Sequence, residues 1–242
     1  SCELRHTTDS ESMHYILHDL AYSAPWLHSA LVGLLQQWFD ENELQNQQSL
    51  DYCLRILING GISSEWLAGL ARKNTEAKIS NEQLSSWYVL WVDTEPDKGI
   101  DALENWLEEL DSEDSSLAAQ QFVTSLLSER HNGRDRSYFK NFQTVPYLKL
   151  LYALMHKHIK ASDDIDRANA GSYSPTLRDD AQRVREQLGG LLSEIPGKET
   201  YTALMELASK AERSWMGRYA YKRAEQDADL DRWSTQQVHD FS

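Results

Sequence analysis

Apolar residues recur along this chain with the three- and four-residue steps of α-helices. Such stripes occur at 13–20, 27–38, 50–58, 66–70, 84–91, 100–110, 117–127, 147–159, 176–193 and 201–207. This spacing places the apolar side chains on one face of each helix. No segment shows the period-two alternation that is typical of a half-buried strand. The pattern therefore predicts an all-α fold of about eleven or twelve helices.

Local signals mark where these helices should begin and end. Ser63 can cap one helix, and Ser80 with Gln83 forms a capping box in front of the next. Ser23 is expected to cap a helix whose first turn holds Pro25. Helix breaks are expected at 60–61, 93–96, 111–116, 130–141 and 195–197. The connections are short, so neighbouring helices should run antiparallel.

The predicted architecture is a set of antiparallel helix pairs, as in a HEAT-like or irregular α-solenoid. The turn at 93–96 resembles the turn inside a HEAT-type unit, although no clean repeat period is present. We expect an acidic helical-repeat part at 1–129, a polar loop at 130–143 and a C-terminal helical part at 144–242. The two helical parts should pack continuously.

Charged residues are distributed unevenly along the chain. The formal net charge is −14. Residues 1–129 hold 6 basic and 22 acidic residues (−16), whereas residues 130–242 hold 18 and 16 (+2). An acidic surface repels phosphate, so the first part is a poor candidate for nucleic-acid binding.

The cysteines and the hydropathy of the chain indicate its cellular compartment. Two cysteines, Cys2 and Cys53, do not make a disulfide framework and fit a reducing compartment. No apolar run approaches the roughly 18 residues that span a bilayer, and no signal peptide is evident. A cytoplasmic location without membrane contact is expected. The chain begins Ser-Cys-Glu, which suggests a piece of a longer protein.

Catalytic and cofactor motifs are missing from the sequence. We find no G-x-S-x-G, no Cys–His signature and no Walker A loop. Serine and aspartate concentrate at expected helix starts, where they cap. The prediction is a chain without enzymatic activity or cofactor. A hydrolase whose active site is dispersed along the chain stays open as an alternative.

Metal binding has weak support. His14 and His18 lie four apart and could face one ion, but a third ligand and a neighbouring glutamate are missing. His156 and His158 point to different helix faces. The acidic stretch 163–166 lacks the ligand spacing of a calcium loop. No metal site is predicted.

Two basic clusters are candidate interaction residues. Arg213, Arg218, Lys222 and Arg223 share an expected helix with aromatic residues, a combination that can bind a nucleic-acid backbone. Neighbouring glutamates can pair with these cations, so a groove for an acidic protein segment is favoured over a nucleic-acid sensor. Arg134 and Arg136 belong to the second cluster, in the polar loop.

The stretch GSYSPTLRDDAQ, residues 171–182, reads as a helix start. Ser174 is a suitable N-cap and Pro175 fits the first helical position. Tyr173 and Arg178 have no such local role, so both are candidate interaction residues. We expect Arg178 to contact the aspartates at 163–166.

Two segments of the C-terminal part resemble a known group of proteins. They read DIDRANAGSYSPTLRDDAQRVREQLGGLLSEIPGKETYTAL and RYAYKRAEQDADLDRW. They are similar to C-terminal regions of large bacterial NACHT- or STAND-type NTPases, some of which act in antiphage defence. The resemblance covers residues 144–242 and includes no catalytic motif. It implies a helical sensor or scaffold segment whose nucleotide-binding domain lies outside this chain.

The sequence thus predicts a non-enzymatic helical region that mediates protein–protein interaction within a larger intracellular bacterial protein. The expected partner is another protein or another domain of the parent chain. Nucleic acid is a less favoured ligand, and no membrane contact is expected.

Overall fold

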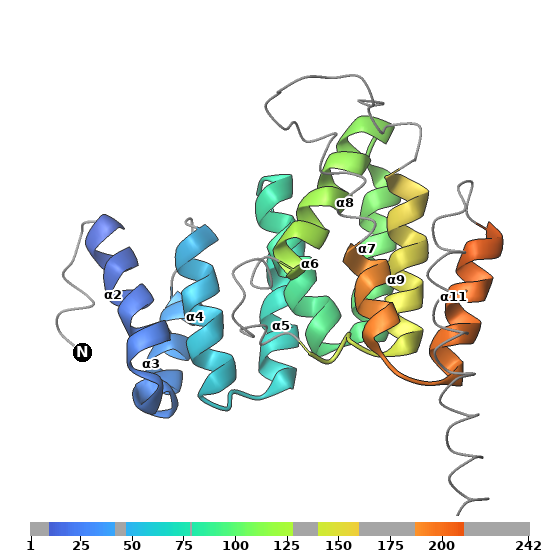
Figure 1. Cartoon of the computed structure of the whole chain (residues 1–242). Helices are drawn as coiled ribbons and strands as arrows, with labels where there is room; N and C mark the ends of the chain where they lie inside the picture. Colours follow the sequence, from blue (N-terminus) through green and yellow to red (C-terminus); the bar gives the residue numbers. More distant parts are fainter. Residues whose placement is uncertain (1–9, 42–46, 78, 128–139, 160–186, 211–242) are drawn as a thin grey trace, which may run out of the picture.

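The computed structural model describes residues 10–41, 47–77, 79–127, 140–159 and 187–210. Every regular element in these ranges is a helix, which confirms the all-α prediction. The helices are α2 (Ser10–Ser23), η1 (Pro25–Leu27), α3 (His28–Glu41), α4 (Gln47–Asn59), α5 (Ser64–Thr75), α6 (Asn81–Thr94), α7 (Pro96–Glu109), α8 (Ser112–Leu127), α9 (Val145–His158) and α11 (Lys198–Lys210). Residues 187–194 are also helical. Figure 1 shows these helices following one another, broadly in chain order, from α2 at one end to α11 at the other.

The helices pack mainly against near neighbours in the sequence. At the N-terminal end, α2 and α3 both pack on α4. Further along, α6 contacts α5, α7 and α8, and α9 contacts α7, α8 and α11. The edge-to-face contact between Phe39 and Trp66, with centroids 6.1 Å apart, links α3 to α5. One cluster of buried side chains extends from Leu17 to Leu207.

Several predicted helix ends are confirmed. Ser63 accepts a hydrogen bond from the Trp66 backbone N–H at 3.3 Å. Ser80 and Gln83 make both bonds of the capping box. Gly61 follows the end of α4 with φ of 85°, in the left-handed region that glycine adopts without a steric penalty. These ends follow from local chemistry, which explains why the sequence predicts them.

The predicted cap at Ser23 is wrong. Ser23 is the last residue of α2, and the next helical segment begins as the short 3₁₀ turn η1 with Ala24 at its N-cap. Ala24 has no side-chain acceptor, so η1 lacks a side-chain cap. Pro25 is at the start of η1, as predicted for a residue without a backbone N–H.

The turn between α6 and α7 depends on a close approach of two backbones. Glu95 alone links the two helices, and Pro96 opens α7. A Cβ atom on Gly99 would lie 2.6 Å from both Cα and N of Val92. A side chain cannot fit at that distance, so α6 and α7 need glycine at this position.

Aromatic rings fill the space between α6 and α7. Tyr88 stacks on Trp106 with centroids 4.7 Å apart and on Trp91 at 6.3 Å. Burial raises the pKa of Tyr88 to about 12, with a further contribution from the negative charge of Glu109. Tyr88 therefore stays neutral and acts as a packing residue. Among the described helices, none combines the length and the apolarity that crossing a bilayer requires.

Candidate functional site

The interaction residues that the charge pattern singled out lie outside the described residues. They are Arg134, Arg136, Tyr173, Arg178, Arg213, Arg218, Lys222 and Arg223. The same is true of the aspartates at 163–166 that Arg178 was expected to contact. These assignments stay predictions.

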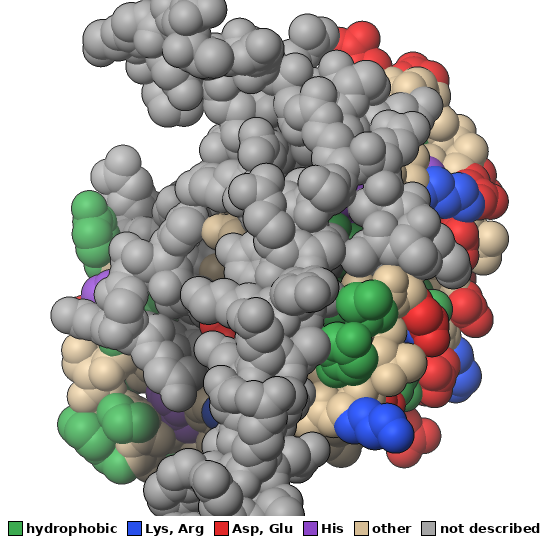
Figure 2. Space-filling model, turned by 45° about the vertical axis from the view of Figure 1, so that its right-hand side comes forward, with side chains coloured by type: hydrophobic (Ala, Val, Ile, Leu, Met, Phe, Trp, Pro, Cys, Tyr) green, Lys and Arg blue, Asp and Glu red, His purple; other side chains and the backbone are tan. Residues whose placement is uncertain are grey.

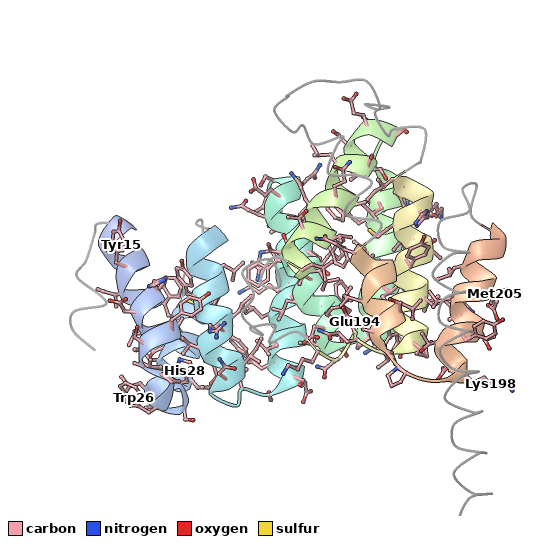
Figure 3. All side chains as sticks on the ribbon, viewed as in Figure 1. Tyr15, Trp26, His28, Glu194, Lys198 and Met205 are labelled. Atoms are coloured by element: carbon pink, nitrogen blue, oxygen red, sulfur yellow. The ribbon has the colours of Figure 1, made fainter. Side chains whose placement is uncertain are left out.

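Large apolar side chains are exposed mainly at the α2 end of the described structure. Six large apolar side chains of the described residues are exposed: Tyr15, Ile16, Trp26, Leu27, Leu150 and Met205. The first four belong to α2 and η1, and we call them the α2–η1 surface. Figure 3 shows Tyr15 near one end of α2 and Trp26 beyond the other, and Figure 2 shows hydrophobic side chains in two spots at this side of the molecule.

Trp26 is exposed on a turn that is held in place by its backbone. Its exposed fraction is 75%, an unusual value for so large an apolar side chain. The ring of Pro25, the residue before Trp26, fixes the backbone angle φ of Pro25 itself. The Leu27 N–H donates to the carbonyl of Ala24 at 3.0 Å, and the His28 N–H donates to the carbonyl of Pro25. The indole thus projects from a constrained turn.

His28 locks this turn to the rest of the N-terminal helices. Its side chain is only 2% exposed, and its Nε2 donates to the carbonyl of Leu20, in α2, at 2.9 Å. Gly60, which follows α4, passes close by. A Cβ atom there would lie 2.8 Å from the His28 carbonyl oxygen and 2.5 Å from Val32 Cγ2. The α2–α3 connection therefore rests against the end of α4.

A second set of contacts fixes α2 to α4. The Arg55 Nε donates to the carbonyl of Ala21 at 3.2 Å, and its guanidinium lies 4.4 Å from the centre of the Tyr22 ring. Tyr22 and Tyr52 meet edge to face at 5.9 Å, and the His18 ring contacts both. Arg55 thereby ties the C-terminal end of α2 to α4 just before η1.

Asp93 forms a buried polar anchor at the end of α6. It is 4% exposed and accepts a 2.8 Å hydrogen bond at Oδ1 from the backbone N–H of Asn141. Burial raises the pKa of Asp93 to about 6, although backbone donors at Asn141, Phe142 and Lys140 act in the opposite direction. The residue holds the segment that precedes α9, and its burial leaves no access for a substrate.

Ser115 and His158 form the described pair that comes nearest to a nucleophile and its base. Ser115 Oγ lies 2.5 Å from His158 Nδ1, which joins the start of α8 to the end of α9. Nucleophilic catalysis also needs an accessible hydroxyl. Ser115 is only 3% exposed, so a substrate carbonyl cannot approach its oxygen. The pair fits a link between helices.

Ion pairs beside this link connect α9 to α7. Lys157 binds both Glu104 and Glu108, which lie one helical turn apart on α7. Hydrogen bonds from the two glutamates raise the pKa of Lys157, and its hydrogen bond lowers the pKa of Glu108. All three side chains are exposed, so solvent screens their attraction and their contribution to stability is small.

Metal ligands do not converge in the described part of the chain. No group of three His, Cys, Asp or Glu side chains that could hold an ion occurs there. Among the candidate histidines, His18 contacts aromatic rings and Asp19, and His158 contacts Ser115. These contacts give both rings a structural role.

Sequence reasoning missed Trp26 as a site residue, because it read residues 23–26 only as the start of a helix whose apolar stripe begins at Leu27. The usable signal was the short Pro-Trp-Leu segment directly after a helix that reaches Ser23. A turn of three residues is too short to form an apolar helical face, so it does not place the Trp26 indole against the core.

Comparisons of the chain with protein-family models, with curated proteins and with solved structures yield no match.

Proposed function

We propose that this chain is a non-enzymatic helical module that binds a protein partner through the α2–η1 surface. The observation that carries the proposal is Trp26, which is 75% exposed on a turn fixed by Pro25 and by the buried His28. Leu27 is exposed on the same turn, and Tyr15 and Ile16 are exposed on α2.

Physical reasons favour binding as the use of this turn. An indole left in water forgoes the free energy that its burial would provide, and tryptophan is enriched among residues that dominate protein interfaces. Association also costs free energy when it orders flexible groups. The η1 turn is already ordered by Pro25 and His28, so docking on Trp26 avoids much of that cost.

The larger role that we propose is that of a scaffold or sensor region in a larger intracellular bacterial protein. The resemblance of residues 144–242 to NACHT- and STAND-type proteins supports this role, and the sequential packing of the helices supports a HEAT-like or irregular α-solenoid. The partner would then be another protein or another domain of the parent chain.

Site-specific crosslinking tests the proposal. A photoreactive phenylalanine analogue replaces Trp26 in the full chain, and a matched control carries it at Leu150, which is also exposed but belongs to α9. We expect a discrete crosslinked product from position 26 that position 150 does not give. The captured partner, once purified, should bind the wild-type chain at least about tenfold more tightly than Trp26→Ala, the loss expected for an interface anchor.

Two results would oppose the proposed function. One is equal crosslinking from positions 26 and 150, which would mean that the α2–η1 surface is not a preferred site. The other is turnover of a substrate by the purified chain alone, which would support the alternative of a hydrolase.

A further inference from the structure

We infer that the partner of the α2–η1 surface is a polypeptide segment that carries both large apolar side chains and Lys or Arg. The inference rests on the proposed function, because it names the chemistry of the ligand for the same surface. It is carried by the charge distribution around Trp26 and by the position of Asp19 beside the apolar side chains.

Basic residues are missing from the sequence that forms this end of the molecule. No Lys or Arg occurs between Arg5 and Arg55. The sequences of α2, α3 and α4 together contain five acidic residues and one basic residue, a formal charge of −4. A ligand that docks here therefore meets a negative field around an apolar centre, which favours cationic segments and repels anionic ones.

The single basic residue of α2–α4, Arg55, is committed to contacts within the fold. Its Nε donates to the Ala21 carbonyl, and its guanidinium covers the Tyr22 ring at 4.4 Å. This arrangement uses the cation to join α2 to α4. Any positive charge at this interface must therefore come from the partner.

Asp19 places a negative charge directly beside the apolar side chains. Its side chain is 77% exposed, and it follows Tyr15 by four positions and Ile16 by three, so all three lie on one side of α2. Asp19 Oδ1 is 3.3 Å from Nδ1 of the adjacent His18 and remains open to a ligand on its solvent side.

The spacing along α2 suggests the shape of the ligand. From Tyr15 to Ser23, the end of α2, the chain advances by eight positions, or roughly 12 Å at the helical rise of 1.5 Å per residue. Figure 3 shows Trp26 beyond that end. An amphipathic helix of about three turns, roughly 16 Å, is long enough to lie along this stretch. Its apolar side chains would lie near Tyr15 and Trp26, and its Lys or Arg would lie between them, opposite Asp19.

The same charges argue against other occupants. A two-fold contact between copies of this chain would place one acidic surface against the same acidic surface. Nucleic acid would meet repulsion between its phosphates and this surface. A cationic, apolar polypeptide is the partner class whose charge is complementary.

Fluorescence anisotropy with labelled synthetic peptides and the full chain tests the inference. The first probe is a 15-residue helical peptide, about four turns, with leucines at both ends of one face and lysines between them. The second has glutamate in place of each lysine, and the third has the composition of the first in a shuffled order without an apolar face. The variants are Trp26→Ala, Asp19→Asn and Asp19→Lys, with Leu150→Ala as the matched control.

We expect the cationic amphipathic peptide to bind at least about tenfold more tightly than the acidic and shuffled peptides, the difference that one anchor or charge contact can supply. Trp26→Ala should lose this binding and Leu150→Ala should retain it. Asp19→Asn should weaken it, high salt should weaken it further, and Asp19→Lys should shift preference toward the acidic peptide.

Several outcomes would overturn the inference. Equal binding of the acidic or the shuffled peptide would remove the case for a cationic apolar ligand. Self-association abolished by Trp26→Ala in sedimentation would identify a second copy as the occupant, and Trp26-dependent binding to phosphatidylcholine vesicles would identify a lipid surface. If no peptide binds but the crosslinker at position 26 captures a protein, the inference fails while the proposed function stands.

Discussion

Asn141 fixes the segment before α9 to Asp93 at the end of α6, although 48 positions separate the two residues. Its backbone N–H donates to Asp93 Oδ1 at 2.8 Å, and its side-chain Nδ2 donates to Oδ2 at 3.4 Å. Both carboxylate oxygens are thus used. The adjacent Phe142 side chain is fully buried, so the contact sets the position from which α9 starts.

Asp93→Asn should remove a pH dependence of stability. The pKa of Asp93 in the folded chain is about 6, above its ordinary 3.8. This group therefore stabilises the fold most below pH 3.8, and that contribution is lost as the pH rises through 6. The loss amounts to about 3 kcal/mol at most. Urea unfolding between pH 4 and 7.5 should show the difference between wild type and Asp93→Asn changing by that order.

Asp93→Ala provides the comparison for this effect. It leaves the backbone donors at 140–142 without their acceptor, so we expect the free energy of unfolding to fall by about 1–3 kcal/mol at pH 7. A wild-type chain whose unfolding free energy follows that of Asp93→Asn at every pH would contradict the burial argument.

Gly99→Ala should destabilise the chain, whereas Gly69→Ala should not. The new methyl group at position 99 would lie 2.6 Å from the backbone of Val92 and force α6 and α7 apart, at a cost of about 1–3 kcal/mol. Gly69 lies in α5 with no atom within 4 Å of an added Cβ, so alanine should stabilise there by about 0.5–1 kcal/mol. Thermal unfolding of both variants measures the contrast, and equal effects would mean that the two helices do not approach so closely.

The parts of this fold that the sequence predicts are those determined by local chemistry. The capping box of Ser80 and the link before Pro96 depend on residues within a few positions, and both are confirmed. The fit of Gly99 against Val92 and the bond from Asn141 to Asp93 depend on how helices pack. No periodicity in the sequence specifies such contacts.

The candidate site also depends on packing that the sequence alone does not reveal. Charge clusters drew attention to basic residues such as Arg134 and Arg213, which lie outside the described residues. Trp26 escaped notice because residues 23–26 were read only as a helix start, and a helix-start signal does not show whether a side chain is buried or exposed. The absence of Lys and Arg from positions 6–54 was visible in the sequence, but it gained meaning only once the indole was seen to be exposed.

Asp111 should contribute to stability as the cap of α8. Its Oδ1 accepts from the backbone N–H groups of both Glu113 and Asp114 at 3.0 Å. Asp111→Ala removes this acceptor and should lower the free energy of unfolding by about 1 kcal/mol. Asp111→Asn keeps a side-chain oxygen and should lose much less. Chemical denaturation of the three proteins distinguishes the cap from a general effect of charge, since a purely electrostatic role would make the two variants equal.

Cys53 should resist thiol reagents until the chain unfolds. Its side chain is fully buried in α4, and burial raises the pKa of its thiol to about 12. Only about one molecule in ten thousand would then carry the reactive thiolate at pH 8. In a Cys2→Ser variant, which leaves Cys53 as the sole thiol, the reaction with a chromogenic disulfide should be slow in buffer and rapid in denaturant. Rapid reaction in buffer would show that α4 opens readily.

Trp26→Ala should leave the stability of the fold nearly unchanged. Its indole is exposed, so removal opens no cavity, and we expect the free energy of unfolding to stay within about 0.5 kcal/mol of wild type. Trp106→Ala is the matched comparison, because that buried ring stacks on Tyr88 and its loss should cost about 3–5 kcal/mol. Urea denaturation followed by circular dichroism measures both. A large loss of stability in Trp26→Ala would mean that the indole supports the fold, and the turn would then no longer stand out as a surface kept for a partner.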